Sequence, residues 1–270
     1  MRRIFDVFIL AFLLGLASCA PEQEQNLADD PKIAVLNYHS IMPQQFYEPL
    51  NVDNPWILPQ EVFYEHMRYL YENGFNPLTS CQLIDFLHNN ADLPKNPVII
   101  TFDDGYLDNY LFAAPILRQF GFTAMQFLIG IAILDETPTM TAFPTQFMSI
   151  YEILGSKDVF EFGSHTYAMH RRNDGIPLLV SESVEAIRAD LRQSFAGPLS
   201  FTTDLAYPFG ISSANAREAL EAEGVKFAFT TQFGYVQRNS SPLMLPRFYV
   251  THHWTIEKFS EIVSGEWRGR

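Results

Sequence analysis

Two adjacent carboxylates follow a strongly apolar stretch of the sequence. Asp103 and Asp104 come just after residues 97–100, Pro-Val-Ile-Ile, a run that is typical of a buried strand. Two acids at such a place repel one another and lose hydration, which costs free energy unless something compensates. Either a turn carries the two side chains into solvent, or a cation lies beside them.

Two histidines supply further candidate metal ligands. His165 and His170 are five residues apart, too far for pairing on one turn of a helix, but a loop can bring both imidazoles together. One carboxylate and two imidazoles leave an open position on a divalent metal such as zinc. At that position a water becomes more acidic and a carbonyl is polarised. The second carboxylate could then act as general base, and His39 could protonate a leaving group.

Each of these motifs taken alone has a simpler interpretation. An Asp-Asp-Gly sequence is usually a turn with solvated acids, and two histidines five residues apart are usually unrelated surface residues. Because the aspartates and His165 both fall at the ends of predicted strands, we favour a common site.

Strand and helix patterns alternate along residues 32–270, without a Pro- or Ser-rich break. Strands are expected at 32–39, 97–102, 123–130, 159–165, 204–210 and 226–231. Helices are expected at 58–75, 80–90, 106–121, 143–156, 181–197 and 212–224. This alternation predicts a parallel sheet covered by helices, either open or closed into a barrel. Chemistry in such folds gathers at the strand ends, where His39, both aspartates and His165 fall.

The composition restricts the class of partner. The chain has 270 residues, of which 47% are hydrophobic, so it can bury a sizeable core. Its formal net charge is -13, whereas nucleic-acid binders and proteins of anionic membrane surfaces are usually basic. We therefore expect no nucleic-acid partner, and an acidic surface that tolerates neutral or cationic ligands.

The N-terminus reads as a secretory signal rather than as part of the fold. Arg2 and Arg3 precede an apolar segment at 7–16 that is short for a membrane span. Residues 16–19, Leu-Ala-Ser-Cys, resemble the lipobox of bacterial lipoproteins, which predicts lipidation of Cys19; ordinary signal cleavage is the alternative. The expected organisation is a signal peptide at 1–19, a flexible tether at 20–31 and one domain at 32–270.

This leader predicts an exported protein that is lipid-anchored to a bacterial membrane. With two membranes the anchor would lie in the outer membrane or on the periplasmic face, and otherwise at the cell surface. Cys81 then remains as a lone thiol that cannot form an internal disulfide, and we expect it to be a small buried residue rather than a nucleophile.

Four motifs together resemble those of a known enzyme family. They are TFDDGY at 101–106, SHTYAMH at 164–170, YPFG at 207–210 and LPRFYV at 245–250. In this order they resemble the motifs of the polysaccharide deacetylases, carbohydrate esterase family 4, and the resemblance covers most of 32–260. It implies a single-domain α/β fold, a distorted (β/α) barrel, and metal-dependent removal of N-acetyl groups from a glycan.

The resemblance also implies roles for individual residues. Asp103 is the expected general base, and Asp104, His165 and His170 are the expected ligands of one divalent metal. Zinc is favoured, and cobalt, nickel or iron are compatible with the same ligands. Phe209 stands where a tyrosine is common, but the expected oxyanion donor is its backbone N–H, so the missing hydroxyl matters little.

Other residues have two interpretations each. Arg247 either orients Asp103 through a charge-assisted hydrogen bond or forms a structural ion pair. His252 and His253 compete with His39 for the role of general acid. Tyr106 and Tyr167 are candidate sugar-stacking residues, although aromatic side chains are more often part of the core. For each of these three sets of residues, both interpretations are compatible with the sequence.

The spacing of the two histidines and the early LNYH sequence at 36–39 resemble one subgroup of the family. That subgroup acts on poly-β-1,6-N-acetylglucosamine, a biofilm exopolysaccharide, and its early histidine, here His39, is the general acid. The resemblance adds exopolysaccharide export machinery as an expected partner. Peptidoglycan, chitin oligomers and acetylated xylan are alternative substrates. A glycan-binding surface lipoprotein without activity is an alternative of a different class.

Overall fold

The computed structural model describes residues 30–47, 54–141, 146–196 and 203–269. Residues 31–270 form one compact unit. The expected signal peptide with Cys19, and all but the last residues of the expected tether, lie outside the described residues. Within the described part of the chain, no helix has both the length and the apolar character needed to cross a bilayer.

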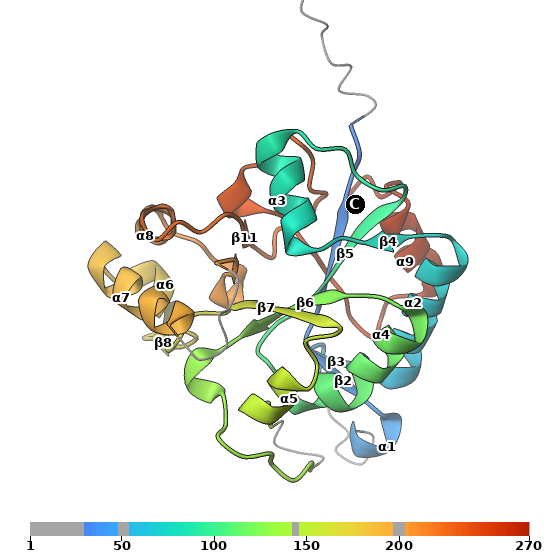
Figure 1. Cartoon of the computed structure of the whole chain (residues 1–270), viewed down its shortest axis with the longest axis horizontal. Coiled ribbons are helices and arrows are strands. Elements are labelled where there is room, and N and C mark those ends of the chain that lie inside the picture. The colour runs from blue at the N-terminus through green and yellow to red at the C-terminus, as the bar shows by residue number, and fades with distance from the viewer. Residues whose placement is uncertain (1–29, 48–53, 142–145, 197–202, 270) are drawn as a thin grey trace, which may run out of the picture. The chain divides into compact units, whose positions relative to one another are not determined.

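The unit consists of short strands and helices that follow one another along the chain (Figure 1). The strands are β1 (Ala34–Tyr38), β2 (Ser40–Met42), β3 (Ile57–Pro59), β4 (Asn76–Pro77), β5 (Pro97–Phe102), β6 (Ala124–Leu128), β7 (Phe160–Ser164), β8 (Arg172–Asn173), β9 (Ile176–Pro177), β10 (Leu205–Ala206), β11 (Ala228–Phe229) and β12 (Phe248–Tyr249). The α-helices are α1 (Gln44–Tyr47), α2 (Gln60–Glu72), α3 (Ser80–Asn89), α4 (Ala114–Phe120), α5 (Ile150–Leu154), α6 (Leu178–Ser181), α7 (Val184–Phe195), α8 (Ala214–Ala222) and α9 (Ile256–Val263). A π-helical segment, Asn109–Ala113, runs directly into α4.

The main sheet is parallel and curls toward closure. Its strands follow the order β11-β10-β7-β6-β5-β1-β12, and β4 pairs with β5 from the side. In the register of the central pair, Ala34 lies beside Val98 and Tyr38 beside Phe102. One segment contacts both edges of this sheet: Leu245 forms a bridge with β11, and β12, which follows it in the chain, pairs with β1. The alternation of strands and helices thus produces the expected (β/α) barrel.

Side chains alternate between the two faces of the sheet, as the period of a strand requires. Val35, Ile99 and Leu245 share one buried cluster with members from β6, β10 and β11, so this cluster fills the inside of the curved sheet. Leu36 and Ile100 belong to a second cluster, which also contains side chains of α2, α4 and α9. The strands therefore read as nearly continuous apolar runs, since both of their faces are covered.

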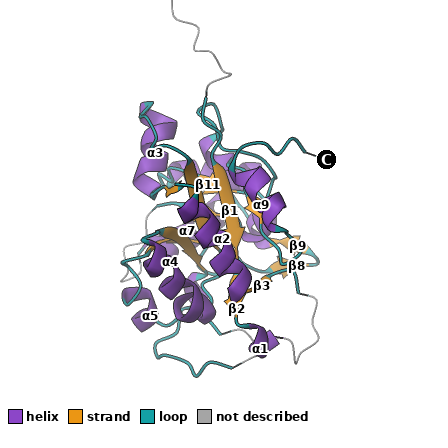
Figure 2. Cartoon of the chain, turned by 90° about the vertical axis from the view of Figure 1, so that its right-hand side faces the viewer, coloured by secondary structure: helices purple, strands orange, loops and turns teal. Residues whose placement is uncertain are grey.

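The helices lie around the strands (Figure 2). In Figure 1, α2, α4 and α9 lie along one side of the strands, and α6, α7 and α8 along the other. Ile187 and Leu191 of α7 and Ala216 and Leu220 of α8 form a third buried cluster. These outer helices cover the sheet but leave the strand ends open for functional side chains.

Three local expectations are wrong. The helix expected at 143–156 is only Ile150–Leu154 where it is described, because Ser149 caps it and Glu152 bonds back to the Ser149 N–H. The strand expected at 204–210 stops at Ala206, and Pro208–Gly210 form a 3₁₀ turn. Cys81 is exposed at the start of α3 rather than buried.

Candidate active site

The inward-facing rows of three strands change from apolar to polar as they approach their carboxyl ends. Val35, Ile99 and Leu245 form an apolar layer inside the sheet. Two residues further along each segment lie Asn37, Thr101 and Arg247, all fully buried. The next inward position on β1 is His39, and on β5 it is Asp103. Period-two alternation thus places a polar layer above the apolar core, with chemically capable groups above it.

A buried ion pair fixes Asp103. Arg247 donates from its two terminal nitrogens to Oδ1 and Oδ2 of Asp103 at 2.8 and 2.7 Å, and Asn37 Nδ2 donates to Oδ2 at 3.0 Å. Arg247 Nε donates to the Thr230 carbonyl at 2.9 Å, which fixes the guanidinium. Burial by itself would raise the pKa of Asp103, but the Arg247 charge and its hydrogen bonds outweigh burial and lower it well below the usual range. Asp103 is therefore ionised at neutral pH.

The three expected metal ligands converge at the strand ends. Nε2 of His165 and Nε2 of His170 each lie 3.5 Å from Oδ1 of Asp104, and the three ligand atoms lie within 4.8 Å of one another. Oδ1 of Asp104 is buried and has no hydrogen-bond partner among the described residues. Ligand bonds of about 2.0–2.1 Å at tetrahedral angles separate two ligand atoms by about 3.4 Å. The spacing therefore fits a divalent cation between them.

The state of His165 fits the same role. Its Nδ1 lies 2.8 Å from the Ala206 carbonyl, so Nδ1–H donates there and leaves the Nε2 lone pair directed at Asp104. Burial lowers the pKa of His165 to about 4, against the opposing charge of Asp103. The imidazole is thus neutral at pH 7, which is the form that binds a metal.

Strained backbone carries these side chains out of the strand ends. Asp104, Thr166 and Phe209 have positive φ angles of 72°, 68° and 60°, a conformation that non-glycine residues rarely adopt. At Gly105, φ is +85° and a Cβ would lie 2.6 Å from Leu128 Cδ2, so the glycine of the Asp-Asp-Gly turn is required. Clustered strain of this kind marks a functional site.

The loop that carries both histidines is held by α7. The carboxylate of Asp190 accepts from the backbone N–H groups of Tyr167 and Ala168 at 2.7 and 2.8 Å. The Thr166 N–H donates to Ser164 Oγ at 3.0 Å. These bonds let residues five apart converge without a helix between them, as the two metal ligands require.

The convergent groups line one pocket of about 320 Å³. His39 lies on its wall beside Trp56, with ring centroids 4.4 Å apart. Burial lowers the pKa of His39, and the charges of Asp104 and Asp103 partly offset this effect. Nδ1 of His39 is buried and has no hydrogen-bond partner within the described residues. His39 is therefore available for proton transfer.

Tyr106 and Phe209 line the same pocket. Burial raises the pKa of Tyr106, and its hydrogen bond to Asp104 raises it further, so the phenol stays protonated and donates to that carboxylate. The centroids of the Phe209 and His170 rings are 4.5 Å apart. The guanidinium of Arg172, from the β8–β9 hairpin, lies 4.1 Å from the centroid of the Phe209 ring. This stack fixes the turn that contains the Phe209 N–H.

The structure does not bring every candidate residue into the pocket. His252 and His253 lie in the turn after β12, their rings 4.0 Å apart, and neither lines the pocket. Tyr167 also lies outside it, its ring against Gly130. Asn37, Trp56 and Asp190 belong to the site or support it, and sequence reasoning missed them. Only Asn37 gave a signal, since it precedes His39 by two residues on an inward-facing row.

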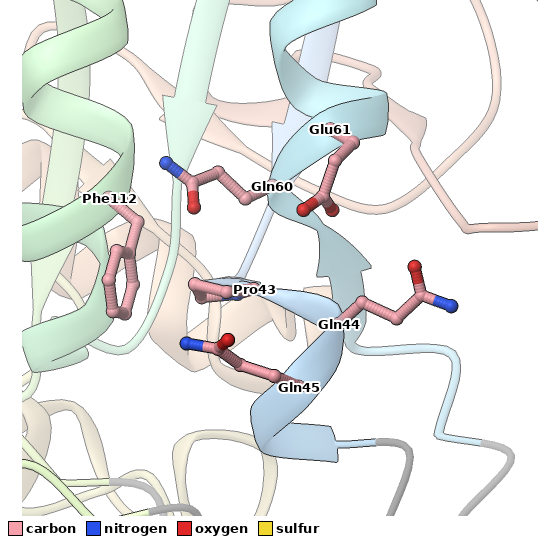
Figure 3. Close-up of a pocket in the computed structure, with 6 residues that line it drawn as sticks. All are labelled: Pro43, Gln44, Gln45, Gln60, Glu61 and Phe112. Carbon is pink, nitrogen blue, oxygen red and sulfur yellow. The ribbon is translucent and has the colours of Figure 1, made fainter.

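A second hollow lies at the other end of β2 and β3 (Figure 3). It is larger, about 780 Å³, and six residues line it: Pro43, Gln44, Gln45, Gln60, Glu61 and Phe112. Figure 3 shows the amides of Gln45 and Gln60 on the side that faces Phe112. Within the described residues, the one group of three acidic or imidazole side chains close enough to hold a metal is that of Asp104, His165 and His170. The active-site candidate is therefore the smaller hollow.

A parallel barrel with carboxylate and imidazole groups gathered at its strand ends is the arrangement of a metal-assisted hydrolase. The family model "Polysaccharide deacetylase" matches residues 90–228, and the chain belongs to this family. It is accordingly a hydrolase that acts on carbon–nitrogen bonds, as the resemblance predicted. The matched range contains Asp103, Asp104, His165, His170 and Phe209, and it excludes His39, Trp56 and Arg247.

Relatives of known name agree with this family. YxkH of Bacillus subtilis (strain 168), assigned to the polysaccharide deacetylases, is 27% identical and covers 93% of this chain and 94% of that protein. The poly-beta-1,6-N-acetyl-D-glucosamine N-deacetylase of Escherichia coli (strain K12) is 25% identical over 73% of this chain. The match covers 34% of the E. coli protein, so this chain spans about a third of its length.

The fold also agrees with a solved structure. The Streptococcus pyogenes deacetylase PplD, in complex with acetate, superposes with a TM-score of 0.72 at 23% identity. The match covers 87% of this chain and 99% of PplD. This likeness concerns the fold, and the chemistry of the present chain has to be argued from its own residues.

Proposed function

We propose that this chain removes N-acetyl groups from an extracellular N-acetylglucosamine polymer, poly-β-1,6-N-acetylglucosamine in the first place, and releases acetate. One observation carries the proposal: a buried, unbonded oxygen of Asp104 faces Nε2 of both His165 and His170 at 3.5 Å. A buried carboxyl oxygen left without a hydrogen-bond partner is costly, and a bound cation would compensate it. The name of the E. coli relative favours this polymer.

Asp104, His165 and His170 would hold one divalent metal, with zinc favoured by two imidazoles and a carboxylate. A metal bound there supplies Lewis-acid chemistry, polarising a carbonyl oxygen and acidifying a water. Tyr106 keeps the remaining part of the Asp104 carboxylate hydrogen-bonded. Such an outer hydrogen bond orients a ligating group.

Asp103 is the proposed general base. Its depressed pKa keeps it ionised over the whole physiological range but also makes it a weak base, so proton transfer from the attacking water would depend on the acidity that a bound metal confers on that water. Both oxygens are fixed by Arg247 and Asn37, which directs the remaining lone pairs into the pocket. Arg247 thereby acts both as a structural ion-pair partner and as the residue that orients the base.

His39 is the proposed general acid, and it would give a proton to the amine nitrogen as the carbon–nitrogen bond breaks. Because burial lowers its pKa, the resting imidazole is mostly neutral at pH 7, and it would have to take up a proton before it can donate one; the protonated form is then a strong acid. The Phe209 N–H would donate to the oxygen that becomes negative when the carbonyl is attacked. Its left-handed turn and its packing between His170 and Arg172 hold that N–H in place before the reaction.

The decisive experiment measures acetate release from the β-1,6 polymer, with and without a chelator, for the wild type and Asp103→Asn. We expect turnover to be lost with the chelator and restored by zinc, and to fall at least a hundredfold in Asp103→Asn while zinc content persists. Acetate release by Asp103→Asn at the wild-type rate would show that Asp103 is not the base.

One control separates chemistry from folding in that experiment. Removing either partner of a buried ion pair costs about 3–5 kcal/mol, so Asp103→Asn also destabilises the protein. Arg247→Met breaks the same pair but keeps the carboxylate. Thermal unfolding of both variants identifies a temperature at which each is folded, and activity is compared there. Parallel assays on peptidoglycan, chitin oligomers and acetylated xylan test the alternative substrates.

For the leader we propose an exported protein anchored by a lipid on Cys19. The support is the sequence Leu16-Ala17-Ser18-Cys19 placed after an apolar segment. Labelled palmitate should be incorporated by the wild type and not by Cys19→Ala, which should appear in the soluble fraction. Export machinery for the polymer would be the natural neighbour of an enzyme at that place.

A further inference from the structure

An exposed tryptophan stands at the mouth of the active-site pocket. Trp56 is 46% exposed to solvent, and it lines the same pocket as Asp103, Asp104, His165 and His170. The pocket lining therefore combines a charged part, formed by these four residues, with an exposed indole. Large apolar side chains left exposed beside convergent polar groups are typical of ligand sites.

The indole is held firmly in this exposed position. The backbone N–H of Trp56 donates to Asn54 Oδ1 at 3.0 Å, and the backbone carbonyl of Trp56 accepts from the Ser40 N–H at 3.1 Å. The rings of His39 and Tyr249 pack against the indole, with centroids 4.4 and 4.6 Å from that of Trp56. The backbone hydrogen bonds hold the Trp56 main chain, and the two ring contacts restrict the rotation of the indole.

The other strongly exposed aromatic side chains lack this setting. Tyr151 is 64% exposed on α5, Tyr71 is 60% exposed on α2, and Phe233 is 48% exposed. None of the three lines the pocket; Tyr71 packs against Phe120 and Phe122, and Phe233 packs against Phe248 and Trp267. Scattered exposed aromatics of this kind need no explanation, whereas Trp56 combines exposure, fixation and proximity to reactive groups.

A pyranose ring matches such an exposed indole. Its axial C–H bonds form an apolar face that packs on the electron-rich face of an aromatic ring, and its hydroxyls remain free for amide partners such as Asn54, which lines the same pocket. A sugar unit stacked on the indole would lie in the pocket that also contains the charged residues, and its acetamide would share that pocket with the reactive groups.

We propose that Trp56, braced by Tyr249, is the stacking residue of a saccharide subsite that binds the pyranose ring whose acetamide reacts. The proposal rests on the proposed function, since it assumes an N-acetylated sugar as the ligand. It assigns the recognition of the sugar ring to Trp56, beside His39, and leaves the bond cleavage to the reactive groups that line the same pocket.

The test measures binding in the absence of turnover. Zinc-loaded Asp103→Asn is titrated calorimetrically with β-1,6- and β-1,4-linked N-acetylglucosamine pentasaccharides, and with acetohydroxamate, a small acyclic metal ligand that has no ring to stack. Adding Trp56→Ala should weaken binding of the better pentasaccharide about tenfold, the effect expected from loss of aromatic stacking. Trp56→Phe should restore most of the affinity, and acetohydroxamate should bind all variants equally.

Tyr151→Ala is the matched control, because it removes an exposed aromatic side chain that does not line the pocket. Equal pentasaccharide affinity with and without the indole would overturn the subsite. Parallel loss of acetohydroxamate binding would also overturn it, since the substitution would then have disturbed the reactive groups. A zinc-loaded protein that binds neither pentasaccharide contradicts the subsite directly. Failure of the proposed function is separate, because it appears in acetate release by the wild type.

Discussion

Two hollows lie at opposite ends of the β2–β3 strand pair, and they differ in volume, in the residues that line them and in the burial of those residues. The larger, of about 780 Å³, is bordered by glutamine side chains, one glutamate and Phe112, most of them at least partly exposed. The smaller, of about 320 Å³, contains buried carboxylates and imidazoles on strained backbone. Volume therefore does not identify the reactive site.

The two hollows differ in whether their charged groups are buried, which costs free energy, or exposed to water. In the smaller one, Asp103, Asp104 and Arg247 are withdrawn from water and must be compensated by one another or by a ligand. In the larger one, water already solvates the single carboxylate of Glu61, which is exposed. Only the first arrangement shifts pKa values and aligns groups before a substrate arrives.

The largest effect is expected from a metal ligand in the smaller hollow. His170→Ala should lower acetate release roughly a thousandfold, because Lewis-acid stabilisation contributes several kcal/mol to the barrier. His170 is 23% exposed at its side chain, so its truncation disturbs folding less than that of buried His165. Zinc content and acetate release are measured together, with His88→Ala, an exposed histidine on α3, as the matched control. Full zinc content in His170→Ala would remove it from the ligand set.

A smaller loss is expected at His39. His39→Gln should lower turnover of N-acetylated sugars roughly a hundredfold, since an amine leaves poorly without a proton. The same variant should lose much less on 4-nitrophenyl acetate, whose leaving group needs no protonation. His253→Gln, on the exposed pair after β12, should leave both rates unchanged. A loss of sugar turnover in His253→Gln instead would move the acid role away from His39.

The strand pair between the hollows carries a pH-dependent contact. Asp108 accepts from Ser40 Oγ at 2.5 Å and from the Ile41 N–H at 3.3 Å, and burial raises its pKa to about 7 against these hydrogen bonds. The folded state therefore holds a proton that the unfolded state loses near pH 4. The resulting stability is complete below pH 4 and is lost as the pH rises through 7.

Asp108→Asn mimics the protonated form and should abolish this dependence. In urea unfolding at pH 4.5, 6 and 8, the free energy of unfolding of the variant should rise relative to that of the wild type as the pH increases, by up to about 4 kcal/mol at pH 8. Asp92→Asn, an exposed aspartate after α3, is the control and should show no such trend. A difference that is constant with pH would mean that Asp108 is ionised in the folded protein throughout.

The smallest effect is expected in the larger hollow. Gln60→Ala and Glu61→Gln should each change the free energy of unfolding by less than about 0.5 kcal/mol, as surface substitutions usually do. Acetate release from short oligomers should stay within about twofold of the wild type. A strong loss of activity in either variant would break the distinction between the hollows, and would extend the functional surface along β2 and β3.

The sequence predicts the chemistry of the smaller hollow better than its walls. Asp103 and Asp104 are adjacent, and His165 follows an apolar strand, so local pattern and alternation bring them to one edge of the sheet. Arg247 was a candidate partner of Asp103 because it lies in LPRFYV, which resembles a motif of the family. Asp103, Asp104 and His165 are predictable because each follows an apolar strand, and the parallel fold converts this local rule into proximity.

The remaining residues depend on geometry that no short pattern contains. Trp56 lies in a turn before a three-residue strand, and its place beside His39 follows from the β2–β3 register. Asp190 is on the buried side of α7, and only tertiary packing reveals that it holds the histidine loop. By contrast, the capping box of Ser149 and Glu152 was visible in the sequence, and it would have corrected the expected helix at 143–156.

The segment that runs from Leu245 to Tyr249 bridges to β11, pairs with β1 and carries the arginine that holds Asp103, 144 positions away in the chain. During synthesis, every strand that bears a catalytic candidate is therefore complete before the group that tunes the base has been made. A nascent chain that stops short of this segment has an open ladder and an uncompensated aspartate at its centre. The Asp103 carboxylate consequently gains its ion-pair partner only when the last strand docks.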